Sequence, residues 1–122
     1  MYLGEEIEKC VTLTSLNLNL RNNKFGDNGA KYLGEIIAKC VILTSLNLNL
    51  SDNSIGTHGA LYLGEGIAKC VALTSLIFDL SINTIGHGAK YLGEEIAKCV
   101  TLTSINLNLT DTIIGDDGNR IL

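Results

Sequence analysis

The segment Leu43–Gly56, with the sequence LTSLNLNLSDNSIG, contains the pattern that decides the fold. Three leucines fall on one side of an extended chain, at Leu46, Leu48 and Leu50, and asparagines occupy the positions between them. An alternation with a period of two is typical of a strand that buries one face and exposes the other. The segment therefore predicts a half-buried β-strand with an apolar face and an amide face.

The same segment occurs four times. Its other copies are LTSLNLNLRNNKFG, LTSLIFDLSINTIG and LTSINLNLTDTIIG. A YLG tripeptide marks the repeat units, which begin near Tyr2, Tyr32, Tyr62 and Tyr91. Internal repeats of this length are typical of a solenoid, in which each unit buries its apolar face against its neighbours. We therefore expect residues 1–122 to form a single domain of about four units.

Each unit also contains a helical pattern. Around the second tripeptide, apolar residues recur every three or four positions, at Ala30, Leu33, Ile37 and Cys40. This spacing is typical of a helix with one buried face. Each unit therefore reads as a strand, a loop and a helix.

The starts of the helices have candidate capping residues. Asp27 follows Gly26, and Thr57 and Asp116 take the same place in other units. The side chain of an N-cap residue accepts a hydrogen bond from a backbone N–H in the first turn of its own helix. We therefore expect these three residues to cap their helices.

The pattern L-x-x-L-x-L-x-L-x-x-N-x-I-G from Leu43, continued by G-A-x-x-L from Gly59, resembles a leucine-rich repeat. The continuation is similar to the ribonuclease-inhibitor-like class of that family. The resemblance implies an α/β solenoid in the form of a short horseshoe arc, with a parallel β-sheet on the inner face and α-helices on the outer face. It also implies that a protein partner binds on the concave sheet face.

Two features depart from the family pattern. An extra Leu-Asn pair in each strand segment keeps the same face apolar, because strand side chains alternate with period two. A longer strand and a β-bulge both accommodate the pair, and we favour the longer strand. The chain also starts and stops within a unit, so we expect a fragment of a longer protein or an uncapped solenoid.

The resemblance assigns a structural role to one asparagine column. It implies that Asn23, Asn53 and Asn83 hydrogen-bond to backbone groups of the loops and form a ladder along the stack. Thr112 takes the fourth place, where the ladder should weaken.

The outward strand positions are the candidate partner-binding residues: Asn17, Asn19, Asn47, Asn49, Ile77, Asp79, Asn106 and Asn108. Most are repeated asparagines, a pattern that also suits solvated or laddering amides. The third unit differs, because Ile77 and Asp79 replace asparagines and Ile82 replaces a polar residue. Exposed apolar residues near one another can mark a contact, so these three form a predicted patch. Drift in one repeat explains the substitutions equally well.

Composition excludes several classes of function. The 13 acidic residues against 9 basic residues give a net charge of -4, which argues against a nucleic-acid partner. The sequence contains no run of 18 apolar residues and no signal peptide, so we expect neither a membrane span nor secretion. The cysteines hold equivalent places in the units, which favours buried free thiols over disulfides or a metal, and a cytoplasmic location.

The sequence contains no recognisable catalytic set. His58 and His87 lie in equivalent loops without an orienting acid, and two loop histidines are weak evidence for a metal. We therefore expect no enzyme, no cofactor and no metal. Two functions remain: a non-catalytic protein–protein interaction module that binds on its sheet face, or a structural repeat protein that self-associates through its uncapped ends.

Overall fold

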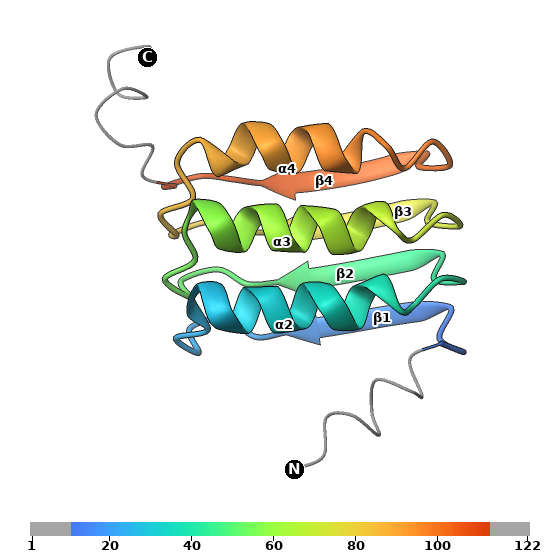
Figure 1. Ribbon diagram of the computed structural model, residues 1–122, viewed down its shortest axis with the longest axis horizontal. Coiled ribbons are helices and arrows are strands. Elements are labelled where there is room, and N and C mark those ends of the chain that lie inside the picture. Colours follow the sequence, from blue (N-terminus) through green and yellow to red (C-terminus); the bar gives the residue numbers. More distant parts are fainter. Residues whose placement is uncertain (1–10, 113–122) are drawn as a thin grey trace.

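A computed structural model describes residues 11–112 of the chain. Within them, strands and helices alternate in the order β1 (Ser15–Asn19), α2 (Gly26–Ala38), β2 (Ser45–Asn49), α3 (Thr57–Ala68), β3 (Ser75–Asp79), α4 (Gly88–Ile96) and β4 (Ser104–Asn108). The four strands form one parallel sheet in chain order, and the units stack on one another (Figure 1). The predicted α/β arrangement of repeated strand–helix units is confirmed.

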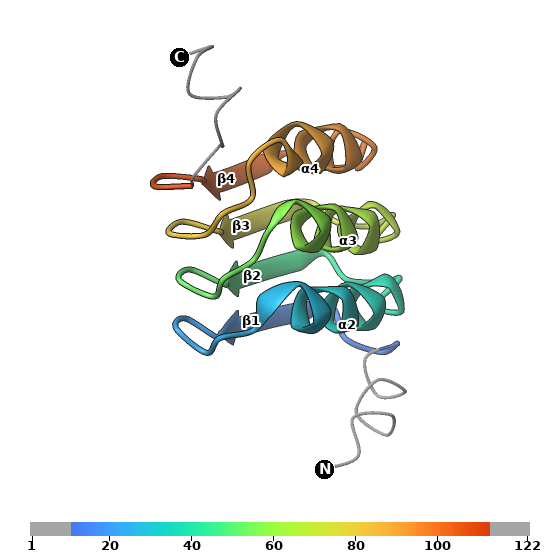
Figure 2. The same cartoon turned by 60° about the vertical axis from the view of Figure 1, so that its left-hand side comes forward.

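The sheet and the helices form two layers. Figure 2 shows the described helices together on one side of the sheet, while the other side carries no helix. The strands pair in register, with Ser45 opposite Ser75 and Ser75 opposite Ser104. Pairing is continuous through β1 to β4, so no bulge interrupts these strands. Backbone bonding continues past them, because the Leu50 N–H donates to the Asp79 carbonyl over 2.8 Å.

The core lies between the two layers. Leu46, Leu48 and Leu50 are at most 1% exposed, which confirms the predicted apolar face of the strand. The predicted helical stripe is also buried: Ala30, Leu33, Ile37 and Cys40. Burying one aliphatic side chain of this size contributes roughly 1.5–3 kcal/mol, so the stack depends on many similar contacts.

Two of the predicted helix caps, Asp27 and Thr57, are wrong. Phe25 occupies the N-cap of α2 without a side-chain bond, and Asp27 lies inside the helix. Its Oδ1 accepts a hydrogen bond from the Gly56 N–H of the next unit at 2.6 Å. Similarly, the Thr57 hydroxyl donates to the Ile85 carbonyl at 3.0 Å. Both side chains lie past the N-cap position, and each forms a hydrogen bond to the next unit. Asp116 lies outside the described residues.

Asn53 bonds two neighbouring loops to each other. Its Oδ1 accepts hydrogen bonds from the N–H groups of Asn23 and Phe25, at 2.9 and 3.1 Å. Its Nδ2 donates to the carbonyls of Leu20 and Ser51, at 2.9 and 3.0 Å. Because one side chain satisfies four backbone groups, the turn after each strand is fixed against the turn of the next unit.

Asn83 repeats this arrangement one unit further along. Its Oδ1 accepts from the N–H groups of Asn53 and Ile55, at 3.0 and 2.9 Å. Its Nδ2 donates to three carbonyls, those of Leu50, Leu80 and Ser81. In the fourth place the Thr112 hydroxyl donates to the Leu109 carbonyl at 2.9 Å. A hydroxyl offers fewer bonds than an amide, so this position binds fewer backbone groups.

Cys40, Cys70 and Cys99 are buried, as predicted, and Cys70 and Cys99 are free thiols. The Cys70 thiol donates to the Ile37 carbonyl at 3.4 Å, and the Cys99 thiol donates to the Ile67 carbonyl at 3.4 Å. Burial raises the pKa of Cys70 to about 11, and the nearby Cys99 adds to this rise. Burial also raises the pKa of Cys99. These thiols therefore stay protonated at neutral pH and bond one unit to the next.

Candidate functional site

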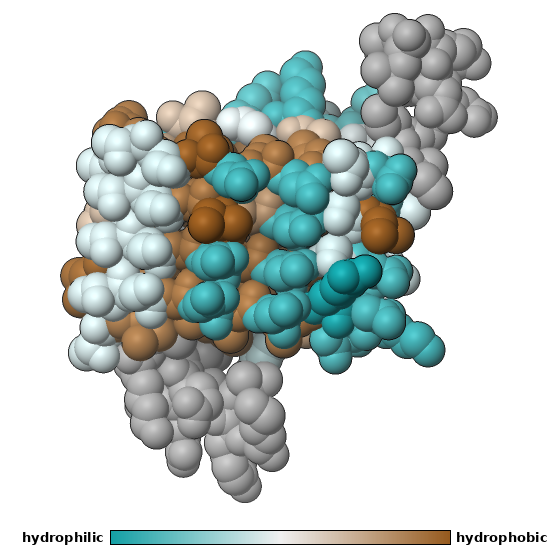
Figure 3. All heavy atoms as spheres, turned by 180° about the vertical axis from the view of Figure 1, so that it is seen from behind, coloured by the Kyte–Doolittle hydropathy of each residue, from teal (hydrophilic) through white to brown (hydrophobic). Residues whose placement is uncertain are grey.

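The face of the sheet opposite the helices is the candidate site. Figure 3 shows this face from behind, where hydrophilic residues form columns along the stack and a few hydrophobic residues interrupt them. The strand register generates these columns, because equivalent positions of successive units lie side by side. The first column contains Asn17, Asn47, Ile77 and Asn106, and the second contains Asn19, Asn49, Asp79 and Asn108.

The second column is engaged in the turns that follow the strands. Asn49 Oδ1 accepts hydrogen bonds from the Ser51 N–H and hydroxyl, at 3.0 and 2.8 Å. Asp79 Oδ1 accepts the same pair from Ser81, at 2.9 and 2.7 Å. Asn19 and Asn108 make equivalent bonds to the residues two positions on. These side chains therefore shape the turns and keep only part of their hydrogen-bonding capacity for a partner.

The first column is free of such bonds. Within residues 11–112 the side chains of Asn17, Asn47 and Asn106 make no hydrogen bond, so no amide ladder forms along the sheet face. The amides of neighbouring strands point outward in parallel and remain available to water or to a partner. Ile77, in the same column, is 43% exposed.

Ile82 has an unusual backbone conformation. It is 46% exposed, and its φ of 56° lies in the left-handed region. The equivalent residues Asn22, Asp52 and Asp111 have φ values of 57°, 56° and 55°. Asparagine and aspartate tolerate this region, whereas a β-branched residue is strained there. The structure thus places an exposed, strained isoleucine in the predicted patch, which sequence alone does not show.

The predicted patch is mixed in chemistry. Asp79 lies between Ile77 and Ile82 along the chain. The patch therefore consists of two exposed isoleucines and a carboxylate from the same unit.

Sequence reasoning overlooked a column of exposed valines at the turns that lead from helices into strands. Their exposed fractions are 45% for Val11, 47% for Val41, 70% for Val71 and 90% for Val100. A signal was present, because valine follows the repeated cysteine in all four units. An apolar residue repeated in every unit suggests a core position. Only the stacked arrangement shows that these valines face solvent.

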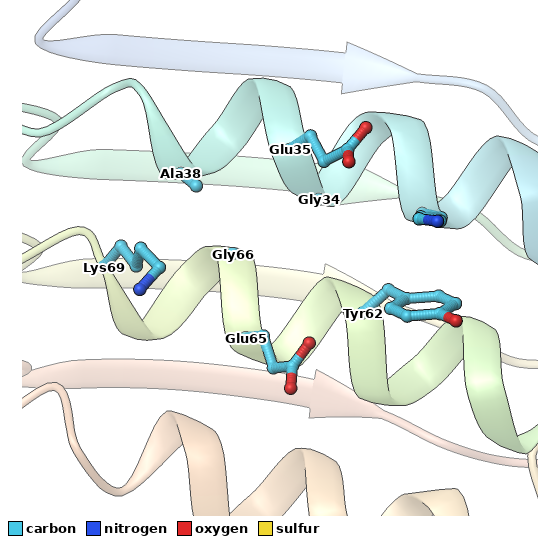
Figure 4. A pocket seen from close by; sticks show the side chains of 8 residues that line it. Gly34, Glu35, Ala38, Tyr62, Glu65, Gly66 and Lys69 are labelled. Atoms are coloured by element: carbon cyan, nitrogen blue, oxygen red, sulfur yellow. The ribbon is translucent and has the colours of Figure 1, made fainter.

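A shallow groove lies between α2 and α3. Figure 4 shows the side chains along it, which come from Lys31, Gly34, Glu35, Ala38, Tyr62, Glu65, Gly66 and Lys69. Along the groove Gly66 lies directly against the backbone of Gly34, where an added Cβ would clash, while equivalent positions carry Ile36 and Glu95. Its volume of about 240 Å³ is below the range of small-molecule sites, and its two lysines and two glutamates favour no ligand charge. We interpret it as a consequence of close helix packing.

Other predicted features bear little on the site. Within residues 11–112 no three histidine, cysteine or acidic side chains lie close enough to hold a metal. Among the described helices, none is long and apolar enough to span a membrane. The chain ends invoked for self-association lie outside the described residues.

Comparison with known proteins concerns the fold. No family model matches the sequence, and no curated protein matches it. A solved structure named "Leiomodin-1 Actin-Binding Site 2 (ABS2)" is similar, with a TM-score of 0.64 and 18% sequence identity over 99% of this chain and 70% of that chain. Together with the parallel strand–helix units, this likeness fits a leucine-rich-repeat fold.

Proposed function

We propose that this chain is a non-catalytic protein–protein interaction module that binds its partner on the open face of the sheet. The observation that carries the proposal is the first column of that face, which lies on the side of the sheet opposite the described helices and contains Asn17, Asn47, Ile77 and Asn106. The amides offer donors and acceptors that are not used within the described chain, and Ile77 adds an apolar contact.

The rigid backbone supports this function. The ladder of Asn53 and Asn83 fixes the turns at the ends of the strands, so the outward side chains are held in place before a partner arrives. A preorganised surface loses less conformational entropy on binding than a flexible one. The buried asparagines therefore serve binding indirectly, by positioning the sheet.

We also propose the finer architecture. The α-helices in the outer layer and the I-G-x-x-G-A-x-x-L continuation support the ribonuclease-inhibitor-like class, with the sheet on the concave face of a short arc. The free, buried thiols support a cytoplasmic location, because thiols stay reduced there. Chain 1–122 is one repeat domain in this proposal, with units beginning near Tyr2, Tyr32, Tyr62 and Tyr91.

The similar solved structure supports a binding role, because its name describes an actin-binding site. A shared fold at 18% identity does not carry over a partner. Actin is nevertheless a defined first protein to test against this chain, beside partners found by cross-linking.

Site-specific photo-cross-linking in cells tests the proposed binding face. A photoreactive amino acid placed at Asn47 should give discrete adducts with a partner, whereas the same group at Tyr91 should not. Tyr91 is a matched control because it is 44% exposed on the helical layer. Adducts that form equally from both positions, or from Tyr91 alone, would contradict binding on the sheet face.

A further inference from the structure

The third unit contains two exposed isoleucines that lie on either side of a carboxylate along the chain. Ile77 and Ile82 are 43% and 46% exposed, and Asp79 lies between them. In the second unit the same three positions hold Asn47, Asn49 and Asp52, so both isoleucines are specific to the third unit. Desolvating two such side chains favours binding only if the partner brings apolar groups to cover them.

Further carboxylates lie on both sides of Ile82. The Asp52 N–H donates to the Ser81 carbonyl at 3.0 Å, and the Ile82 N–H donates to the Thr110 carbonyl at 3.1 Å, so the three turns are bonded side by side. Neighbouring parallel chains lie about 4.8 Å apart. Asp52 and Asp111 therefore flank Ile82 at the equivalent positions of the adjacent turns.

These carboxylates form no ion pair with a cationic side chain of the described residues, 11–112. Among residues 11–112 the ion pair is formed by Lys98 and Glu95, on the helical side. Asp79 uses Oδ1 for its two bonds to Ser81, which leaves Oδ2 for another donor. The surface around Ile82 is thus apolar at its centre and negatively charged around it.

We propose that Ile77, Asp79 and Ile82, with Asp52 and Asp111 beside them, bind a cationic segment of a protein partner in which a lysine or arginine is flanked by apolar side chains. The proposal rests on the proposed function and specifies the partner chemistry of the same face. The apolar side chains cover the isoleucines, and the cation lies against Asp79. Charge complementarity of this kind raises the association rate and selects the partner.

A metal ion is a poorer occupant of this surface. A divalent cation needs several oxygen ligands that converge on one point, and the described residues bring together no group of three acidic, histidine or cysteine side chains. A protein cation needs only one or two carboxylates and gains from the apolar surface next to them.

The test uses the full chain and a phage-displayed library of random linear peptides. Peptides are selected on the wild-type protein alone, and their binding to the triple variant Ile77→Asn, Asp79→Asn, Ile82→Asp is then measured. Each substitution introduces the residue found in the second unit, so the fold is retained and can be verified by circular dichroism. The double variant Val71→Thr, Val100→Thr is the matched control, because it removes exposed apolar surface elsewhere.

We expect the selected peptides to contain lysine or arginine flanked by apolar residues. Their affinity, measured by fluorescence anisotropy, should fall about tenfold or more in the triple variant and stay unchanged in the valine control. Asp79→Asn alone should weaken binding about threefold and reduce its dependence on salt between about 50 and about 500 mM.

Three outcomes would overturn the proposal: selected peptides without basic residues, equal binding by the triple variant, or no peptide that prefers the wild-type chain. These outcomes are distinguishable from failure of the proposed function. If cross-linking from Asn47 still captures a partner, the sheet face binds proteins through other residues. If that cross-linking also fails, the binding role itself is wrong.

Discussion

The second unit (residues 32–61) and the third unit (residues 62–90) share a backbone but differ in their exposed surfaces. Their buried residues correspond closely, with Leu50 matched by Leu80 and Asn53 matched by Asn83. Their exposed turn residues do not correspond, because Asp52 is replaced by Ile82 while φ remains 56° in both. The buried layer therefore fixes the backbone, and the exposed positions vary without changing it.

The strain at Ile82 shows that the buried layer determines the backbone conformation more strongly than the exposed residue does. A non-glycine residue in the left-handed region costs about 1–2 kcal/mol relative to its usual conformation. The Ile82 N–H is bonded to Thr110, and the side chain of the next residue, Asn83, makes five hydrogen bonds. These bonds together outweigh the local cost, so the turn conformation is imposed on an unsuitable residue.

The largest expected effect on stability comes from removing the buried asparagine of either unit. It tests whether Asn53 and Asn83 stabilise their turns equally. Asn53→Ala and Asn83→Ala each leave several buried backbone groups without partners, at about 1–3 kcal/mol for each group not rescued by water. We expect each variant to lower the free energy of unfolding by about 3–5 kcal/mol, measured by urea denaturation. Asn23→Ala is the control, because Asn23 is exposed and should cost far less. A loss below about 1 kcal/mol at Asn83 would show that the ladder does not fix the turn.

The second prediction concerns the packing between helices of neighbouring units. A Cβ added to Gly66 of α3 would meet the Gly34 backbone of α2, whereas a Cβ added to Gly93 of α4 meets no atom within 4 Å. Alanine favours helix by about 1 kcal/mol over glycine, and overpacking costs about 1–3 kcal/mol. We expect Gly66→Ala to lower stability by about 2 kcal/mol and Gly93→Ala to raise it by up to about 1 kcal/mol. If thermal unfolding shows that both substitutions change stability in the same direction, the close packing of α2 on α3 does not require glycine at position 66.

Much of the fold can be predicted from local sequence, because buried residues recur at short, regular intervals within each unit. The leucine alternation around Leu46 and the helical stripe around Leu33 predict the buried faces of strand and helix, and both are buried. The caps could not be predicted in this way. Asp27 bonds to Gly56, 29 residues away, and that contact arises from the stacking of units. A rule for N-caps considers only the residues of one helix, so it does not predict a hydrogen bond between units.

The candidate site is less predictable than the core. The substitutions at Ile77 and Asp79 are visible by comparing units, but the left-handed conformation of Ile82 appears only in the folded turn. The exposure of Val100, at 90%, is likewise hidden, because an apolar residue beside a buried cysteine suggests core. The exposure of this position depends on how neighbouring units stack, which the residue type does not specify.

The third prediction uses the thiol of the third unit. Folding raises the pKa of Cys70 from 9.0 to about 11, so the unfolded chain loses this proton first as pH rises. The contribution of Cys70 to stability is therefore complete below about pH 9 and is lost progressively up to about pH 11. We expect a loss of about 1–2 kcal/mol between these limits, measured by urea unfolding. Cys70→Ala should reduce this alkaline dependence, and a variant with an unchanged pH slope would contradict the assignment.

The smallest expected effect comes from exchanging the turn residues of the two units. Ile82→Asp should stabilise the chain by about 1 kcal/mol, because aspartate tolerates the positive φ and isoleucine does not. Asp52→Ile should destabilise it by a similar amount, since φ at Asp52 is 56° as well. Urea midpoints of the two variants measure both changes. If Ile82→Asp gains stability while binding to the selected basic peptides falls, the strained isoleucine is retained at a cost in stability because it serves recognition. If Ile82→Asp gains stability without loss of binding, Ile82 is a product of drift in one repeat.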